Sequence, residues 1–116
     1  MISPRHALKQ YFGFDQFRPG QEEAVQRVLA GQSTLLVMPT GSGKSLTYQL
    51  PALLLPGLTL VISPLIALMK DQVDQLTELG LPVTFINSAL PNHEINHRLR
   101  AVREGHVKLL YVAPER

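Results

Sequence analysis

The sequence contains no cysteine, and its surplus of positive charge is small. The absence of cysteine excludes a disulfide framework and any metal site that uses thiolate ligands. The chain has 11 Lys and Arg residues and 9 Asp and Glu residues, so its formal net charge is +2. Composition alone therefore does not indicate a nucleic-acid partner.

The sequence also lacks a long hydrophobic run. The longest apolar stretch, residues 50–58, is interrupted by Pro51, Pro56 and Gly57 and is too short to span a bilayer. Residues 1–6 carry no apolar segment of the kind found in a signal peptide. We therefore expect no membrane partner and a location in the cytoplasm.

Hydrophobic residues make up 45% of the 116 residues, which suits one small domain with a packed core. Runs rich in Val, Leu and Ile predict strands at residues 34–38, 58–63, 83–87 and 108–113. Helical patterns predict helices at residues 4–12, 21–30, 44–55, 65–79 and 92–104. Ser3 is the expected N-cap of the first helix, and Arg98, Arg100 and Arg103 are expected to face outward on the last. Strands that alternate with helices predict an α/β fold, a parallel sheet with helices on both faces.

A Gly-rich segment, Met38 to Ser45, follows an expected strand and precedes an expected helix. Its two glycines permit the positive φ angles that turn successive backbone N–H groups toward an anion, and the following helix adds its positive end. Met38 stands where the general phosphate-loop pattern has glycine, so the segment fits the narrower pattern typical of helicases and translocases. The predicted phosphate-binding residues are Thr40, Gly41, Ser42, Gly43, Lys44 and Ser45.

Two side chains of this segment carry the expected chemistry. Lys44 suits the β- and γ-phosphates of a nucleotide, and the Ser45 hydroxyl is the hard oxygen ligand that Mg²⁺ prefers. The alternative is an ordinary Gly/Ser turn followed by an incidental lysine. Because the strand, turn and helix occur in the required order, we predict phosphate binding.

Four segments at the expected intervals resemble the RecQ family of superfamily 2 DNA helicases. They are residues 12–21 (FGFDQFRPGQ), 38–45 (MPTGSGKS), 61–73 (VISPLIALMKDQV) and 111–116 (YVAPER). The resemblance implies a P-loop NTPase domain of the RecA-like type, of which residues 1–116 are the N-terminal portion. It also implies ATP and Mg²⁺ as cofactors and DNA as the partner, and hence a location at the nucleoid of a bacterium or in the nucleus of a eukaryote.

By this resemblance, the first segment recognises adenine. Phe14 and Arg18 sandwich the base, and the Gln21 amide reads its edge, for which an amide is suited because it offers one donor and one acceptor. Phe12 and Phe17 are instead expected to pack in the core beneath the first helix.

By the same resemblance, the turn at Ser63 and Pro64 holds a single-strand DNA backbone, and Arg116 lies near the DNA path. An ordinary turn with Ser63 as a helix N-cap explains these residues equally well. His93 and His97 are spaced for metal binding on one helix face, but a simple surface pair is the favoured interpretation.

The resemblance implies ATP-dependent 3′-to-5′ DNA strand separation in repair and recombination, with Lys44 in the catalytic machinery. The chain ends at Arg116, before the DEAH-type motif and the second lobe of such helicases, and the sheet is expected to be incomplete there. We therefore expect the isolated chain to have little or no activity. The alternatives are a nucleotide-binding module without catalysis and an NTPase that acts on something other than DNA.

Overall fold

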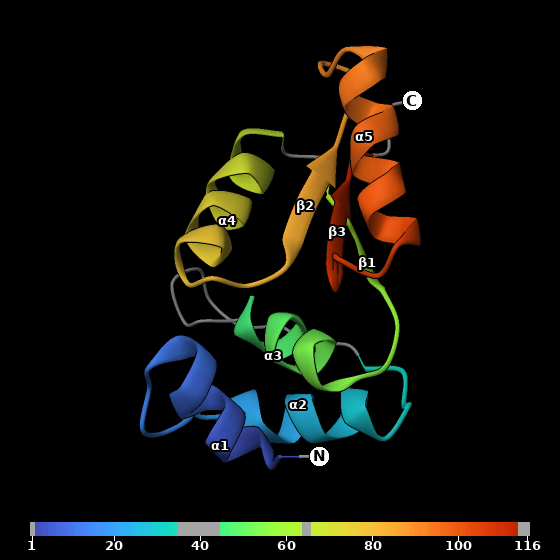
Figure 1. Cartoon of the computed structure of the whole chain (residues 1–116). Coiled ribbons are helices and arrows are strands. Elements are labelled where there is room, and N and C mark those ends of the chain that lie inside the picture. Colours follow the sequence, from blue (N-terminus) through green and yellow to red (C-terminus); the bar gives the residue numbers. More distant parts are fainter. Residues whose placement is uncertain (1, 35–44, 64–65, 114–116) are drawn as a thin grey trace. The chain divides into compact units, whose positions relative to one another are not determined.

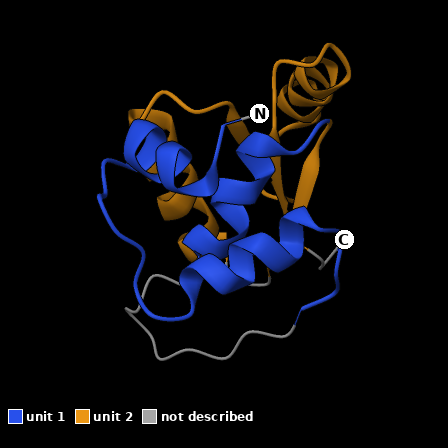
Figure 2. Cartoon of the chain, turned by 90° about the horizontal axis from the view of Figure 1, so that it is seen from below, with its two compact units in different colours: residues 1–56 blue, residues 57–116 orange. Residues whose placement is uncertain are grey.

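The computed structural model describes residues 2–34, 45–63 and 66–113. The chain forms two units, Met1–Pro56 and Gly57–Arg116 (Figure 2). The predicted strand at residues 34–38 lies outside the described residues apart from its first residue.

The first unit is helical. The Ser3 hydroxyl accepts a hydrogen bond from the His6 backbone N–H at 3.2 Å, which confirms Ser3 as the first N-cap. The helix expected at residues 4–12 changes type along its length, because its second half has the wider hydrogen bonding of a π-helix. The helices of this unit are α1 (Pro4–Ala7), η1 (Leu8–Phe12), α2 (Gln21–Leu29) and α3 (Leu46–Leu54).

The core of the first unit joins these helices. Its fully buried or nearly fully buried side chains come from each of them: Ala7, Leu8, Val25, Leu46 and Leu50. The burial of these side chains supplies the main stabilisation that holds α1, α2 and α3 together. Leu46, the first residue of α3, thereby lies near residues of the loop between η1 and α2.

The second unit is a parallel three-stranded sheet with two helices. The strands are ordered β1-β3-β2, and both neighbouring pairs are parallel. These strands and helices confirm the predicted elements at residues 58–63, 65–79, 83–87, 92–104 and 108–113, with ends shifted by a residue or two. The elements are β1 (Thr59–Ile62), α4 (Ile66–Glu78), β2 (Val83–Ile86), α5 (Asn92–Arg103) and β3 (Leu109–Val112).

The two helices of this unit lie on opposite faces of the sheet. The chain crosses from β1 to β2 through α4 and returns from β2 to β3 through α5. Because parallel crossovers are right-handed, this reversal of direction puts the two helices on different faces. Figure 1 shows α4 and α5 on the two sides of β2, on which both pack. The predicted parallel sheet with helices on both faces is confirmed.

The central strand β3 is buried, as expected for a strand with neighbours on both sides: Leu109, Leu110 and Tyr111 are almost inaccessible. Among the described strands, β1 lies at one edge of the sheet. Its Leu60 and Ile62 point to the same face and remain exposed. The second unit therefore carries an apolar face on its β1 edge.

The expectation that Arg98 faces outward was wrong. Its guanidinium lies 4.4 Å from the centre of the Phe85 ring and donates hydrogen bonds to the Phe85 carbonyl at 2.9 Å and the Thr84 hydroxyl at 3.3 Å. Glu94, one turn earlier on α5, accepts a third hydrogen bond from Arg98 at 3.0 Å. Arg98 thus ties α5 to β2, while Arg100 and Arg103 are exposed as predicted.

Among the described residues, no helix combines the length and the hydrophobicity that crossing a membrane requires.

Candidate nucleotide-binding site

A small hollow on the first unit brings together the three residues predicted to recognise a base. It has a volume of about 150 Å³ and is lined by Phe14, Gln16, Arg18, Gln21 and Leu46. Phe14, Gln16 and Arg18 come from the loop between η1 and α2. Gln21 is the first residue of α2, and Leu46 is the first residue of α3. Such a volume is well below that of a typical drug-sized site and suits one flat ring system.

The loop begins where the π-helix η1 ends. Gly13 takes the left-handed conformation, with φ of 77°, and its N–H donates to the Lys9 carbonyl at 3.1 Å. The Phe14 N–H donates back to the Leu8 carbonyl at 3.4 Å. This reversal anchors the Phe14 backbone to the helix end, while its side chain stays 55% exposed. Phe14 therefore offers a ring face at the hollow.

The Gln21 side chain is held by the backbone of the same loop. It is only 3% exposed, and its Oε1 accepts a hydrogen bond from the Arg18 N–H at 2.8 Å. The Gln21 N–H donates in return to the Arg18 carbonyl at 3.1 Å. Because a backbone N–H can only donate, the oxygen of the Gln21 amide must face Arg18 and the amide nitrogen must face away. The backbone of the loop thereby fixes which way the Gln21 amide is turned.

The other two phenylalanines of this region pack as expected. Phe12 and Phe17 are partly buried against the core of the first unit, which confirms their predicted packing role. Of the three phenylalanines between residues 12 and 17, only Phe14 is strongly exposed.

Most of the predicted phosphate loop lies outside the described residues. Thr40, Gly41, Ser42, Gly43 and Lys44 belong to that part, and Ser45 is described. Ser45 is half-buried at the N-cap of α3, where its carbonyl accepts hydrogen bonds from the Gln49 N–H at 3.1 Å and the Tyr48 N–H at 3.3 Å. The residue that follows Ser45 is Leu46 of the hollow. The C-terminal end of the phosphate-loop segment is therefore next in the chain to the hollow.

A metal site built from several acidic or His side chains does not occur in the described part of the chain. No group there contains three or more His, Cys, Asp or Glu side chains able to hold a metal ion. His93 and His97 are both exposed on α5, in agreement with a surface pair. Mg²⁺ at nucleotide sites takes most of its ligands from phosphates and water, so a single hard oxygen such as the Ser45 hydroxyl fits that use.

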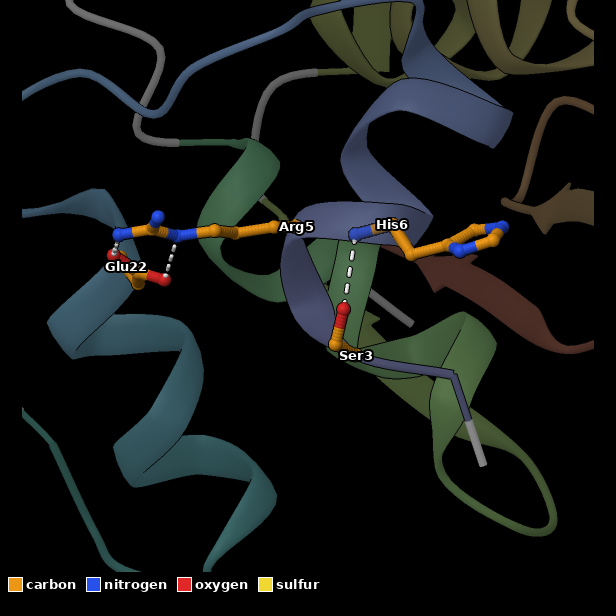
Figure 3. Close-up of polar contacts among 4 residues, drawn as sticks. All are labelled: Ser3, Arg5, His6 and Glu22. Atoms are coloured by element: carbon orange, nitrogen blue, oxygen red, sulfur yellow. Dashed lines mark hydrogen bonds and ion pairs between the residues drawn. The ribbon is translucent and has the colours of Figure 1, made fainter.

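Two ion pairs flank the loop that lines the hollow. Arg5 donates two hydrogen bonds to the Glu22 carboxylate, from Nε to Oε2 at 2.8 Å and from Nη2 to Oε1 at 3.0 Å. Lys9 donates one from Nζ to the Asp15 Oδ1 at 2.5 Å. Figure 3 shows the Arg5 pair beside the Ser3 cap of α1. Hydrogen bonding to Arg5 lowers the pKa of the Glu22 carboxyl, and hydrogen bonding to Lys9 lowers the pKa of Asp15. Both carboxylates are therefore charged at neutral pH.

The predicted DNA-contact residues belong to the second unit. Ser63 directly follows β1, is half-buried, and its N–H donates to the Val112 carbonyl at 3.0 Å. Pro64 and Arg116 lie outside the described residues. Ser63 thus sits at the carboxyl end of its strand, the edge of a parallel sheet at which ligands bind in α/β folds.

Sequence reasoning missed two residues of the hollow, Gln16 and Leu46, and one polar residue at the sheet edge, Asn87. Asn87 follows β2, is 3% exposed, and accepts a hydrogen bond from the Ala89 N–H at 2.8 Å. The signal for Leu46 was its position directly after the phosphate loop. Gln16 carried no signal beyond its place inside the adenine segment.

The family model of the DEAD/DEAH box helicase matches residues 18–116. This match covers most of the chain, which therefore belongs to the DEAD/DEAH box helicase family.

Within this family the chain is similar to RecQ helicases. It is 54% identical over 110 residues to the ATP-dependent DNA helicase RecQ of Bacillus subtilis (strain 168) and 53% identical over 109 residues to that of Haemophilus influenzae. Each alignment covers 94% of this chain but only 19% and 18% of the respective relative. The chain spans about a fifth of the length of these relatives, and the resemblance to RecQ helicases is confirmed.

A solved structure confirms the fold. The crystal structure of the DUF1998 helicase MrfA bound to DNA and AMPPNP matches with a TM-score of 0.77 and 25% sequence identity. The match covers 98% of this chain and 17% of that one. The α/β architecture is therefore that of a helicase domain.

Proposed function

We propose that the first unit binds ATP, with adenine in the hollow between Phe14 and Arg18. The observation that carries this proposal is that Phe14, Arg18 and Gln21 line one hollow of about 150 Å³. An exposed ring and a guanidinium can stack on the two faces of a flat base. The orientation of the Gln21 amide, with its oxygen beside the Arg18 N–H, sets one acceptor and one donor for the edge of adenine.

The triphosphate binds the segment Thr40 to Ser45 in this proposal. Lys44 neutralises the β- and γ-phosphates, and the Ser45 hydroxyl is the protein ligand for Mg²⁺. When bound, Mg²⁺ supplies charge neutralisation of the phosphate oxygens. The adjacency of Ser45 and Leu46 in the chain supports this, because it joins the phosphate end of the site to the base end.

For the whole protein we propose ATP-dependent DNA strand separation in the 3′-to-5′ direction, in repair and recombination. The similarity to RecQ helicases over 94% of the chain supports this activity. The MrfA structure was determined with DNA bound, which supports DNA as the partner here. Ser63, with Pro64 and Arg116, is the proposed contact with the DNA backbone, a contact that does not depend on base sequence.

Nucleotide binding by variants of this chain tests the ATP site. We expect Lys44→Ala to weaken binding of ATP and GTP alike, because the lysine of a phosphate loop binds the phosphates, which both nucleotides share. Gln21→Ala should instead lower the preference for ATP over GTP. The ratio of the two affinities should fall about tenfold if one contact of two hydrogen bonds to the base is lost. Isothermal titration with both nucleotides measures this.

Gln26→Ala is the matched control for Gln21→Ala. Gln26 lies on the same helix, is exposed, and is not among the residues of the hollow. It should leave both affinities unchanged. Equal binding of ATP and GTP by the unmodified chain would contradict the assignment of the hollow to adenine.

A further inference from the structure

The Arg5–Glu22 pair joins two elements that are distant in the chain at the position next to Gln21. Arg5 lies on α1, and Glu22 lies in the first turn of α2, 17 residues further on. Its two parallel hydrogen bonds, Nε to Oε2 and Nη2 to Oε1, are visible in Figure 3. A planar guanidinium that meets a carboxylate in this way restrains the orientation of the carboxylate as well as its distance.

The helical segment that carries Arg5 packs into the core of the first unit. Ala7 and Leu8, which follow Arg5 in the same turn of helix, are completely or almost completely buried in the core of the first unit. The Ser3 hydroxyl caps the helix on its other side through the His6 N–H. Arg5 therefore reaches Glu22 from a helix whose own position is set by packing.

The pair contributes little to overall stability. The side chain of Arg5 is 76% exposed and that of Glu22 is 30% exposed. Ion pairs in water at such sites are screened and stabilise the fold only slightly. The pair therefore acts mainly on the local geometry of the first turn of α2. Gln21, which is predicted to read the base, directly precedes Glu22 there.

The second pair restrains the opposite end of the same loop. Lys9, on η1, contacts Asp15, which lies between Phe14 and Gln16 of the hollow. The partners Asp15 and Glu22 bracket Arg18 and Gln21, and both pairs take their cation from the helical segment of residues 4–12. Lys9 has no planar fork, so its pair restrains distance rather than orientation.

We propose that Arg5 is a positioning residue of the base hollow, which holds the first turn of α2 so that the Gln21 amide discriminates adenine from guanine. This inference rests on the proposed ATP site. It assigns to the N-terminal helix a part in nucleotide selection, although Arg5 does not line the hollow.

Binding of ATP, GTP and inorganic tripolyphosphate to the full chain tests the role of Arg5. Arg5→Gln should lower the preference for ATP over GTP about threefold to tenfold. This range corresponds to the cost of ordering one side chain, here that of Gln21, when the nucleotide binds. Tripolyphosphate binding and the melting temperature should stay near those of the unmodified chain. Glu22→Gln should have the same effect as Arg5→Gln.

A conservative variant separates geometry from charge. Arg5→Lys keeps the positive charge but cannot form two parallel hydrogen bonds, so we expect it to lose most of the ATP preference as well. Glu23→Gln is the matched control, because Glu23 pairs with Arg27 on the same helix at 3.6 Å and does not join α2 to α1. It should leave the preference unchanged.

The outcomes distinguish this inference from the proposed function. If the unmodified chain prefers ATP and Arg5→Gln prefers it equally, the positioning role is wrong and the ATP site stands. If the unmodified chain shows no preference, the adenine assignment itself fails. Parallel loss of ATP, GTP and tripolyphosphate binding in Arg5→Gln, or an equal loss of preference in Glu23→Gln, would overturn the positioning role.

Discussion

Phe12 and Phe14 are separated by one residue, yet they lie in opposite environments. Phe12 packs against the core of the first unit, and Phe14 is 55% exposed at the hollow. The left-handed conformation of Gly13 lies between them and turns the chain away from the helix. The different environments of the two rings separate the packing role of Phe12 from the binding role that we propose for Phe14.

Alanine substitutions at these two positions should have opposite consequences. We expect Phe14→Ala to weaken ATP binding about tenfold, because a stacked aromatic contributes on the order of 1–3 kcal/mol per base, with little change in stability. Phe12→Ala should lower the free energy of unfolding by roughly 2 kcal/mol, less than for a fully buried phenylalanine. Urea denaturation and nucleotide titration of each variant measure the two effects. A destabilised Phe14→Ala that binds ATP normally would contradict this separation of roles.

At the scale of elements, the Arg98 side chain joins α5 to β2, and no local sequence pattern predicted this contact. Arg98 is 21% exposed and interacts with the ring and carbonyl of Phe85, the hydroxyl of Thr84 and the carboxylate of Glu94. Arginine is usually exposed, so the sequence pattern favoured an outward side chain. The long apolar stem of arginine permits partial burial once a partner ring and carbonyl are in reach.

The Arg98 contact should be measurable as stability. We expect Arg98→Met, which keeps the apolar length, to lower the free energy of unfolding by about 1–3 kcal/mol, because hydrogen bonds from a charged group and the contact with the ring are lost. Arg100→Met, on the exposed side of the same helix, should change it by less than about 0.5 kcal/mol. Chemical denaturation of both variants provides the comparison, and equal effects would show that Arg98 does not tie α5 to β2.

The predicted elements were largely correct, because their signals are local. The N-cap at Ser3, the apolar face of α4 and the continuous apolar run of β3 each lie within one segment of sequence. The change to a π-helix after Ala7 was not predicted, because it depends on how Leu8 enters the core and how the chain turns at Gly13.

At the scale of the whole molecule, the flanking ion pairs predict how stability changes with acid. The pKa of Glu22 lies below its ordinary value of 4.5 because Arg5 stabilises the charged form. A carboxyl whose pKa is lower in the folded chain than in the unfolded chain stabilises the fold above its unfolded pKa. That contribution is lost as the pH falls through the folded pKa.

We therefore expect a small stability advantage of the unmodified chain over Glu22→Gln at neutral pH. The advantage should stay constant down to about pH 5 and disappear as the pH falls below the ordinary value of 4.5. Melting temperatures of both proteins across this range measure it. An advantage that grows on acidification would show that Glu22 is not stabilised by Arg5 in its charged form.

The sequence by itself determined most helices and strands of the described residues, the parallel α/β class, the phosphate-loop pattern from Met38 to Ser45 and the resemblance to RecQ helicases. These are properties of contiguous segments, in which the spacing of apolar residues and the order of glycines are sufficient signals. Only the tertiary structure decided that Arg98 lies against Phe85, that Leu46 and Gln16 line the hollow beside Gln21, and that Arg5 meets Glu22. Exposure and contact depend on how segments distant in the chain pack against one another, and no local pattern contains that information.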